Sequence, residues 1–279
     1  MAITNFISTV WSENLYNQLD KQYIAVKNCN RDYEGEIKGK GSSVKICGVG
    51  DVNVFEYTKD TDMSTPETLS DSVRTLTIDQ AKGFNFQIDD IDRAQSSPKL
   101  MDMAMKNAAD ALANTADTYI YSLYGSAGST IKNESTTASN IITTIIDART
   151  KLYENNVSDA SSIIIEVSPQ IAALILKAKI DISSSNSDSL ESGLLGSIGG
   201  CKIFVSNNIH TEEQSGVNYH KCIARTKRAI AYAEQLSEIV AYRPEKRFAD
   251  AVKGLHLYGA KVVYPNEMVV LDMGIAKEA

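Results

Sequence analysis

The chain has 279 residues, of which 43% are hydrophobic and 23% are charged, a composition typical of globular proteins with a sizeable core. Its net charge of −7 makes it a poor candidate for binding nucleic acid over the whole surface, because phosphates are neutralised by Lys and Arg, although local basic patches are compatible with it. No window approaches the roughly 18 consecutive apolar residues of a membrane span, and the N-terminus lacks the features of a signal peptide. We therefore expect a protein made in the cytoplasm, with no membrane partner.

The first 28 residues are typical of an arm that ends in a short amphipathic helix. Trp11, Leu15 and Leu19 are spaced by four residues, and Ser12 is a favourable N-cap. A helix that presents a large aromatic side chain needs a surface to pack on. We expect that surface to belong to the chain's own core or to a neighbouring subunit.

The next fifty residues, Asn28–Thr77, are rich in Gly, Ser, Thr and Asp and poor in large apolar side chains. Two runs, Ser43–Cys47 and Asp51–Tyr57, alternate as strands do. They predict an extended β-hairpin, which is barely stable alone and whose open edges favour pairing with a partner.

A strand and a long helix are predicted next. Apolar residues fall on even positions within Leu76–Ile91, the period of a half-buried strand. Ser97 and Pro98 then supply an N-cap and a first helical residue. Apolar residues spaced three and four positions apart predict a helix over Pro98–Tyr124. This helix is roughly 40 Å long, and Gly125 ends it.

At the end of this strand lie three clustered carboxylates, Asp89, Asp90 and Asp92. Such a cluster can bind a cation, but the Gly and the late Glu of an EF-hand are absent. The simpler interpretation is a polar end of the strand, placed near the positive N-terminus of the following helix. A metal-assisted hydrolase that uses these three residues is the alternative hypothesis.

The remainder alternates between helices and strands. After a loop over Gly125–Ser139, a helix is predicted over Asn140–Glu154 and a buried strand over Ser162–Val167, and Ser168 with Pro169 caps a helix that ends at Lys179. A polar loop over residues 180–197 precedes strands over Cys201–Ser206, His220–Arg225, Ala229–Ala233, Ser237–Tyr242, Ala249–Val263 and Val269–Met273.

Motifs for catalysis or cofactors are absent. Cys29, Cys47, Cys201 and Cys222 have no zinc-ligand spacing, and the three histidines form no HExxH pair. No GxSxG turn occurs, and Gly35–Ser43 lacks the register of a phosphate-binding loop. We therefore expect free thiols, no cofactor, no metal and no enzymatic activity.

In their order, these segments resemble the major capsid proteins of tailed bacteriophages, the HK-ninety-seven-like fold that encapsulins share. The resemblance covers nearly the whole chain. It is carried by "TVWSENLYNQL", "YEGEIKGKGSSVKI", "GDVNVFEYTKDTDM", "LTIDQAKGFNFQIDDIDRAQ", "GLLGSIGGCKIFVSNNI" and "AYRPEKRFADAVKGLHLYGAKVVYP".

The resemblance implies an α+β fold with four parts. They are an N-terminal arm (residues 1–30), an extended β-hairpin or E-loop (31–78), a peripheral domain with a long spine helix (79–135 and 235–264), and an α/β axial domain (136–234 and 265–279). It also implies that the loop over residues 180–197 points to a five- or six-fold axis.

The implied function is structural. The chain would assemble with itself as pentamers and hexamers into an icosahedral phage head that encloses double-stranded DNA without sequence-specific binding, aided by a separate scaffolding protein and a portal. It would be made in the host cytoplasm and end in the virion. An encapsulin-like compartment shell is the nearest alternative.

Contacts between subunits are expected at the arm, the hairpin, the joint between hairpin and spine helix, and the closing strands. Opposite charges across such contacts set register more than strength. The candidate contact residues are Trp11, Lys59, Asp60, Asp62, Asp89, Asp90, Asp92, Arg243, Lys246 and Arg247.

Overall fold

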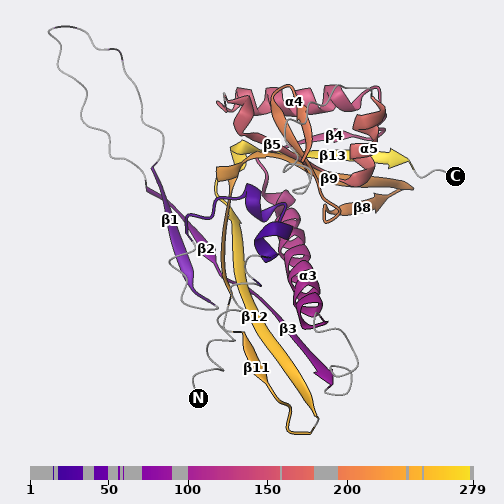
Figure 1. Cartoon of the computed structure of the whole chain (residues 1–279). Coiled ribbons are helices and arrows are strands. Elements are labelled where there is room, and N and C mark those ends of the chain that lie inside the picture. The colour runs from indigo at the N-terminus through magenta and orange to yellow at the C-terminus, as the bar shows by residue number, and fades with distance from the viewer. Residues whose placement is uncertain are drawn as a thin grey trace.

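The computed structural model describes residues 15, 18–33, 41–49, 56, 59, 71–89, 100–157, 159–178, 194–236, 239–246 and 248–276. It contains two larger β-sheets, a long helix and a two-stranded ribbon that projects from the body (Figure 1). Short 3-10 helices connect these parts: η1 (Val26–Asn28), η3 (Leu123–Ser126), η4 (Ala160–Ser162), η5 (Lys227–Ala229) and η6 (Pro265–Glu267).

The larger sheet has seven strands and carries two helices. Its order is β4 (Ser129–Asn133), β13 (Met268–Ala276), β9 (Val217–Thr226), β5 (Ile163–Val167), β7 (Cys201–Val205) and β6 (Leu194–Ile198), with β8 (Thr211–Gln214) also paired to β9. Helices α4 (Ile141–Glu154) and α5 (Pro169–Lys177) lie on one face of this sheet (Figure 1).

Local sequence explains these elements. Every residue of β5 is buried, as expected for a strand covered on both faces. In α4, Ile141, Ile145, Ala148 and Leu152 are buried at helical spacing. The predicted cap of α5 is confirmed, because the Ser168 hydroxyl accepts the backbone N–H of Ile171 at 3.4 Å.

The second sheet is built around the long strand β12 (Ala249–Val262). Strand β3 (Gln80–Asp89) pairs with one edge of β12, and β10 (Ile230–Leu236) and β11 (Val240–Tyr242) pair in succession with the other, all antiparallel. Helix α3 (Leu100–Ser122) lies along one face (Figure 1).

The opposite face of this sheet is covered by the base of the ribbon, β1 (Ser43–Val49) and β2 (Asp71–Thr77). A separate core cluster forms there; it contains Val44, Ile46, Leu76, Ile78, Ala231, Ala233, Leu257 and Val263. The approach is so close that a Cβ on Gly259 would lie 2.2 Å from the carbonyl oxygen of Thr77. A glycine is therefore required at this position.

Several predictions are confirmed and others are wrong. The long helix is confirmed as α3 followed by η3, although Ser97 and Pro98 lie outside the described residues. The run Leu76–Ile91 is not one strand, because β2 ends at Thr77 and β3 begins at Gln80. Leu76 packs against the ribbon side of the sheet, whereas Phe84 packs into the main core.

Two predicted loops are shorter in the structure than the sequence indicated. The run Gly125–Ser139 contains β4, which pairs in parallel with the edge of β13. The polar loop over residues 180–197 ends in β6 from Leu194, and β8 was not predicted. Strand Asp51–Tyr57 lies outside the described residues, apart from Glu56.

Candidate subunit interfaces and the joint between the sheets

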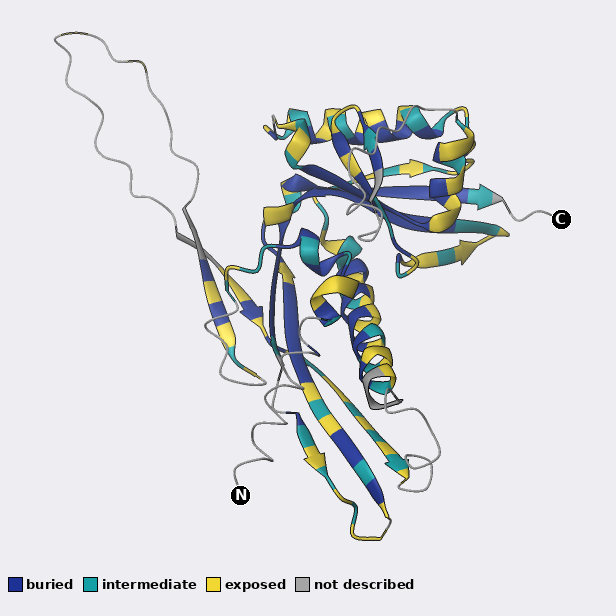
Figure 2. Cartoon of the chain, in the orientation of Figure 1, coloured by how far each residue is buried: buried dark blue, intermediate teal, exposed yellow. Residues whose placement is uncertain are grey.

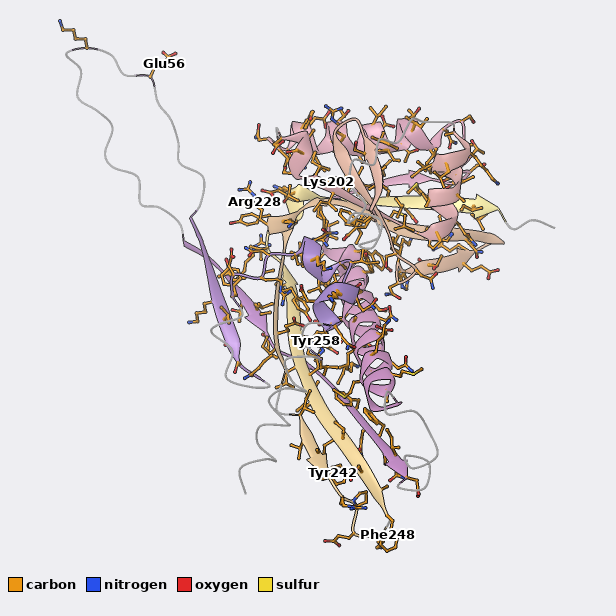
Figure 3. The ribbon with its side chains drawn as sticks, viewed as in Figure 1. Glu56, Lys202, Arg228, Tyr242, Phe248 and Tyr258 are labelled. Atoms are coloured by element: carbon orange, nitrogen blue, oxygen red, sulfur yellow. The ribbon has the colours of Figure 1, made fainter. Side chains whose placement is uncertain are left out.

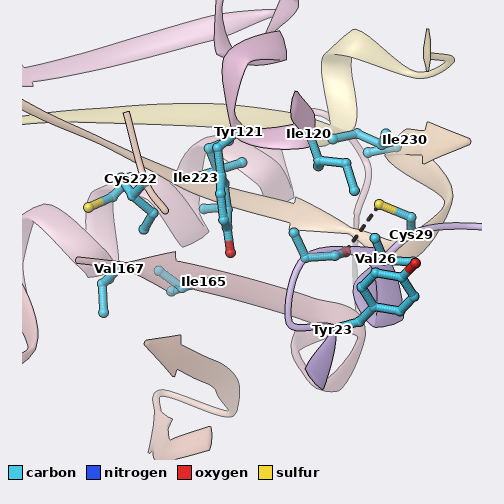
Figure 4. Packing of buried hydrophobic residues seen from close by; sticks show 14 of the residues in the cluster. Tyr23, Val26, Cys29, Ile120, Tyr121, Ile165, Val167, Cys222, Ile223 and Ile230 are labelled. Atoms are coloured by element: carbon cyan, nitrogen blue, oxygen red, sulfur yellow. Dashed lines mark hydrogen bonds between the residues drawn. The ribbon is translucent and has the colours of Figure 1, made fainter. Parts of the chain in front are cut away.

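Residues 18–33, here called the strap, lie between α3 and the two larger sheets. Tyr23, Val26 and Cys29 belong to the main core cluster and lie near Ile120 and Ile230 (Figure 4). Three buried carboxylates hold the strap, one from α3, one from the seven-stranded sheet and one from the four-stranded sheet. Each is described in turn.

Asp117 of α3 accepts the first backbone N–H groups of the strap's turn. Its oxygens lie 3.0, 3.1 and 3.2 Å from the backbone nitrogens of Ile24, Ala25 and Val26. Burial raises the pKa of Asp117 to about 7, although the three N–H donors oppose this rise. Asp117 thus acts as a cap for donors that would otherwise be buried without a partner.

Glu166 of β5 forms a fully buried ion pair with Arg225 of β9. The guanidinium Nε and Nη2 each lie 3.0 Å from a carboxylate oxygen, in the two-pronged geometry that favours Arg. Arg225 also donates to the strap carbonyls of Ala25 (3.1 Å) and Asn28 (2.5 Å). The Asn28 amide donates to Glu166 at 3.1 Å, so the pair and the strap form one network.

Glu234 of β10 is the third carboxylate, and it accepts from two parts of the molecule. The strap donates through the Tyr23 hydroxyl (2.6 Å) and Arg31 (2.7 Å). The sheet donates through the Tyr232 hydroxyl (2.9 Å), and His256 Nε2 lies at 2.8 Å. Burial opposes ionisation, but these partners, led by His256, hold the pKa of Glu234 below its usual value.

The three buried carboxylates and their partners together stabilise the joint between the two sheets. Each carboxylate links the strap to a different element, so the strap cannot detach without exposing several buried polar groups at once. The arrangement is a buried hydrogen-bond and ion-pair network that stabilises the fold.

The cysteines whose side chains the structure describes are also structural. Cys29, Cys201 and Cys222 are buried free thiols, as predicted. Burial raises the pKa of Cys29 to about 11 and that of Cys222 to about 12, which keeps both as unreactive thiols. Among the described residues, no group of three or more His, Cys, Asp or Glu is placed to hold a metal ion.

The predicted contact residues remain a prediction, and the structure describes only four of them. Trp11, Asp60, Asp62, Asp90, Asp92 and Arg247 lie outside the described residues. Lys59, Asp89, Arg243 and Lys246 are exposed, as a role in subunit contacts requires.

Three of these residues lie at the same end of the four-stranded sheet. Asp89 stands opposite Ala249 at the far end of β3, and Arg243 and Lys246 belong to the turn between β11 and β12. Arg243 lies 3.9 Å from Asp250. Lys59 belongs to the ribbon and is not part of this group.

The same turn presents an aromatic residue that sequence analysis missed. Phe248 is 85% exposed and lies at the tip of the sheet, whereas Glu56 lies at the opposite extreme of the chain (Figure 3). The available signal was a bulky apolar residue within the polar turn "RPEKRF".

The sheet is less covered in the middle of β12. Figure 2 shows a continuous buried run along the upper part of β12, and below it the exposed or half-buried stretch 253–255 is followed by buried residues near the tip. A shallow pocket of about 400 Å³ lies there, lined by Gly83, Val240, Gly254 and the half-exposed Leu255 among others.

The described helices include none long and apolar enough to cross a membrane.

Residues 72–271 match the family described as phage capsid protein, and the chain belongs to that family. A search of curated protein sequences gives no significant match.

Solved capsid structures agree over nearly the full chain. A chain of Mycobacterium phage Che8 is 28% identical, with a TM-score of 0.70, covering 90% of this chain and 91% of that one. The capsid of Ralstonia phage GP4 has a TM-score of 0.71 at 11% identity, covering 93% and 91%. The capsid of the native GTA particle has a TM-score of 0.65 at 11% identity, covering 91% and 90%.

The family and the fold define a structural major capsid protein of a bacteriophage, which assembles with itself into an icosahedral capsid. The predictions of fold class and function are thereby confirmed. The encapsulin-like shell and the metal-assisted hydrolase are not favoured by these findings.

Proposed function

We propose that this chain forms pentamers and hexamers that close into a phage head around double-stranded DNA. The observation that carries the proposal is the family match over residues 72–271, which includes the long helix and both larger sheets. A separate scaffolding protein and a portal complete assembly, and the chain is made in the host cytoplasm. With a net charge of −7, it encloses DNA without gripping it tightly.

The proposal assigns four parts to the chain. Residues 1–30 are the arm, 31–78 the hairpin, 79–135 with 235–264 the peripheral domain, and 136–234 with 265–279 the axial domain. The two separate larger sheets and the projecting ribbon support the separation of these parts, but the sheets cross two of the bounds: β4 lies in the seven-stranded sheet, and all of β10 lies in the four-stranded sheet. Projecting elements of this kind become stable when neighbouring subunits cover them.

Subunit contacts are proposed between the hairpin of one subunit and the sheet tip of the next. Between Asp51 and Asp71 the hairpin carries six acidic residues and one basic residue, Lys59. The turn at the sheet tip carries Arg243, Lys246 and Arg247 against Glu245, and Asp89 and Asp250 lie beside this turn. These opposite charges favour Asp60 and Asp62 beside the basic tip, and many such contacts repeated by symmetry hold a closed shell.

Electron microscopy of the purified chain at raised concentration tests assembly itself. Shells or capsomers are expected, and a chain that stays monomeric even with scaffold present would contradict the proposal. Deletion of Asn53–Asp71 is expected to leave the circular dichroism of the body unchanged and to abolish shells. Unchanged shells would refute the role of the hairpin.

Charge reversal tests the proposed pairing. Asp60→Lys with Asp62→Lys should reduce shell yield, as should Arg243→Glu with Lys246→Glu, and the four changes combined should restore it. Asp147→Lys is the matched control, because Asp147 is an exposed acid on α4, away from both surfaces. Absence of rescue, or an equal loss with the control, would refute the pairing.

A further inference from the structure

The first turn of the strap, residues 24–29, docks onto helix α3 through a carboxylate that has no cation beside it. Asp117 is 2% exposed, and its oxygens accept the backbone N–H groups of Ile24, Ala25 and Val26. Among the described residues, no Lys, Arg or His forms a hydrogen bond or ion pair with it. A buried carboxylate without a cation tends to bind a proton, because the ionised form has lost its water.

The cation in this part of the joint is committed to other acceptors. Arg225 uses Nε and Nη2 for Glu166, and it also donates to the carbonyl oxygens of Ala25 and Asn28. Arg225 and Glu166 therefore neutralise each other. An ionised Asp117 would add a second negative charge that faces Glu166, which leaves one guanidinium for two buried carboxylates.

The other ionisable groups around Asp117 do not supply a compensating charge. Tyr121 of α3 and Cys29 of the strap face it, and burial raises the pKa of both side chains, which keeps them neutral. Burial also raises the pKa of Asp117 itself from 3.8 to about 7, and the charge of Glu166 acts in the same direction, against the three N–H donors. With the strap docked, Asp117 therefore holds a proton below neutral pH, whereas in water it would ionise.

We propose that docking of the strap turn onto α3 takes up one proton, carried by Asp117, so that the turn opens more readily as the pH rises towards neutral. Opening exposes Asp117 to water, and its carboxylic acid ionises and releases the proton to the solvent. The strap is then a pH-sensitive contact between the two sheets. The inference concerns the single subunit and does not depend on assembly.

Opening becomes easier over a defined pH range. Below pH 3.8 both states hold the proton, and above about 7 neither does, so the opening constant is flat outside these limits. Between the limits it rises by up to about tenfold for each pH unit. We therefore expect at least about a tenfold rise between roughly pH 5 and pH 7.

Cys29 is placed to report this opening. Its thiol donates to the carbonyl oxygen of Ala25 at 3.2 Å, within the turn that Asp117 caps (Figure 4). The residue is 5% exposed, so a thiol reagent reaches it only after the turn has opened. Cys222 is fully buried in β9, outside the strap, and reports opening of the seven-stranded sheet.

Thiol labelling of the dissociated full-length chain tests the inference. The reagent 4,4′-dithiodipyridine forms a mixed disulfide with each exposed cysteine, and mass spectrometry of the peptides reads Cys29 and Cys222 separately. Dividing each rate by that of a peptide of residues 24–33, measured at the same pH, removes the intrinsic reactivity of the thiolate. Cys29 is expected to react faster than Cys222, and its corrected rate to rise at least about tenfold between roughly pH 5 and pH 7.

Two results from the unmodified chain would overturn the inference. A corrected Cys29 rate that does not change over this pH range excludes proton uptake, whatever the variants show. Equal rates for Cys29 and Cys222 mean that the strap opens only when the whole subunit unfolds.

Two variants assign the proton. Asp117→Asn keeps the shape of the side chain but does not titrate, so the corrected Cys29 rate should become independent of pH. Asp147→Asn, at an exposed acid on α4, is the matched control and should keep the original slope. A slope that persists in Asp117→Asn would belong to the strap's other titratable contact, Glu234 with His256, and would overturn the assignment to Asp117.

Discussion

The buried pair of Glu166 and Arg225 allows a quantitative test of the joint between the sheets. Both side chains have no exposed surface, and Arg225 also donates to two strap carbonyls. Arg225→Met keeps the volume but removes the charge and every donor. Glu166 then remains as an uncompensated buried carboxylate, and the carbonyls of Ala25 and Asn28 lose a partner.

Breaking a buried pair from one side typically costs about 3–5 kcal/mol. That is a large share of the roughly 5–15 kcal/mol of an ordinary domain. We therefore expect Arg225→Met to lower the free energy of unfolding by about 4 kcal/mol. Urea denaturation of dissociated subunits, followed by circular dichroism, measures this loss.

Two further variants make the reasoning refutable. Glu166→Leu combined with Arg225→Met removes both charges and should recover at least half of the loss, because no unpaired charge remains. Arg228→Met is the matched control. The Arg228 side chain is 68% exposed in its pair with Glu267, so its loss should cost less than about 1 kcal/mol. A loss below about 1 kcal/mol for Arg225→Met, or no recovery in the double variant, would show that the pair does not hold the joint.

Three further predictions concern other sites. The pKa of Asp117 is raised from 3.8 to about 7, so the native state binds a proton more readily than the unfolded chain. Protonated Asp117 therefore contributes stability at low pH, and this contribution is lost as pH rises through about 7. Asp117→Asn should flatten this part of the curve of unfolding free energy against pH. An unchanged slope would exclude Asp117 as the source of the pH dependence. Gly259→Ala places a methyl group against the Thr77 carbonyl and should cost about 1–3 kcal/mol in urea denaturation, whereas a neutral result would mean that the ribbon does not pack closely there. Phe248→Ser should leave the melting temperature within about 2 °C, since the ring is exposed, and should reduce shell yield in electron micrographs; equal yields would show that the tip makes no apolar contact.

Much of the fold follows from local pattern. The apolar run of β5, the helical spacing in α4 and the Ser168–Pro169 cap are each decided within a few residues, and all three were predicted. Strand β8 was missed because "TEEQ" is a polar segment whose strand state depends on pairing with β9. The break between β2 and β3 was missed because apolar residues alternate on both sides of it. The alternation shows that a residue faces a core, but it does not show which of the two core clusters that residue contacts.

The buried polar network at the joint between the two sheets could not be predicted from the sequence, for a different reason. Asp117, Glu166 and Glu234 are single acidic residues in ordinary surroundings, and their partners are far away in the chain. Tyr23 and Glu234, for example, are 211 positions apart. No spacing rule links such residues.

The sequence by itself determined the class of fold and the family, because the order of arm, hairpin, long helix and alternating elements depends on local periodicity. Only the tertiary structure decided which carboxylates are buried, which thiols are inert, and which aromatic residue is left at the tip of the sheet. Burial and pairing of these groups depend on elements that meet after folding, and their energies come from desolvation and from partners distant in sequence. The Asp cluster illustrates the contrast: of its members only Asp89 is described, and it lies exposed at the end of β3, next to the basic turn.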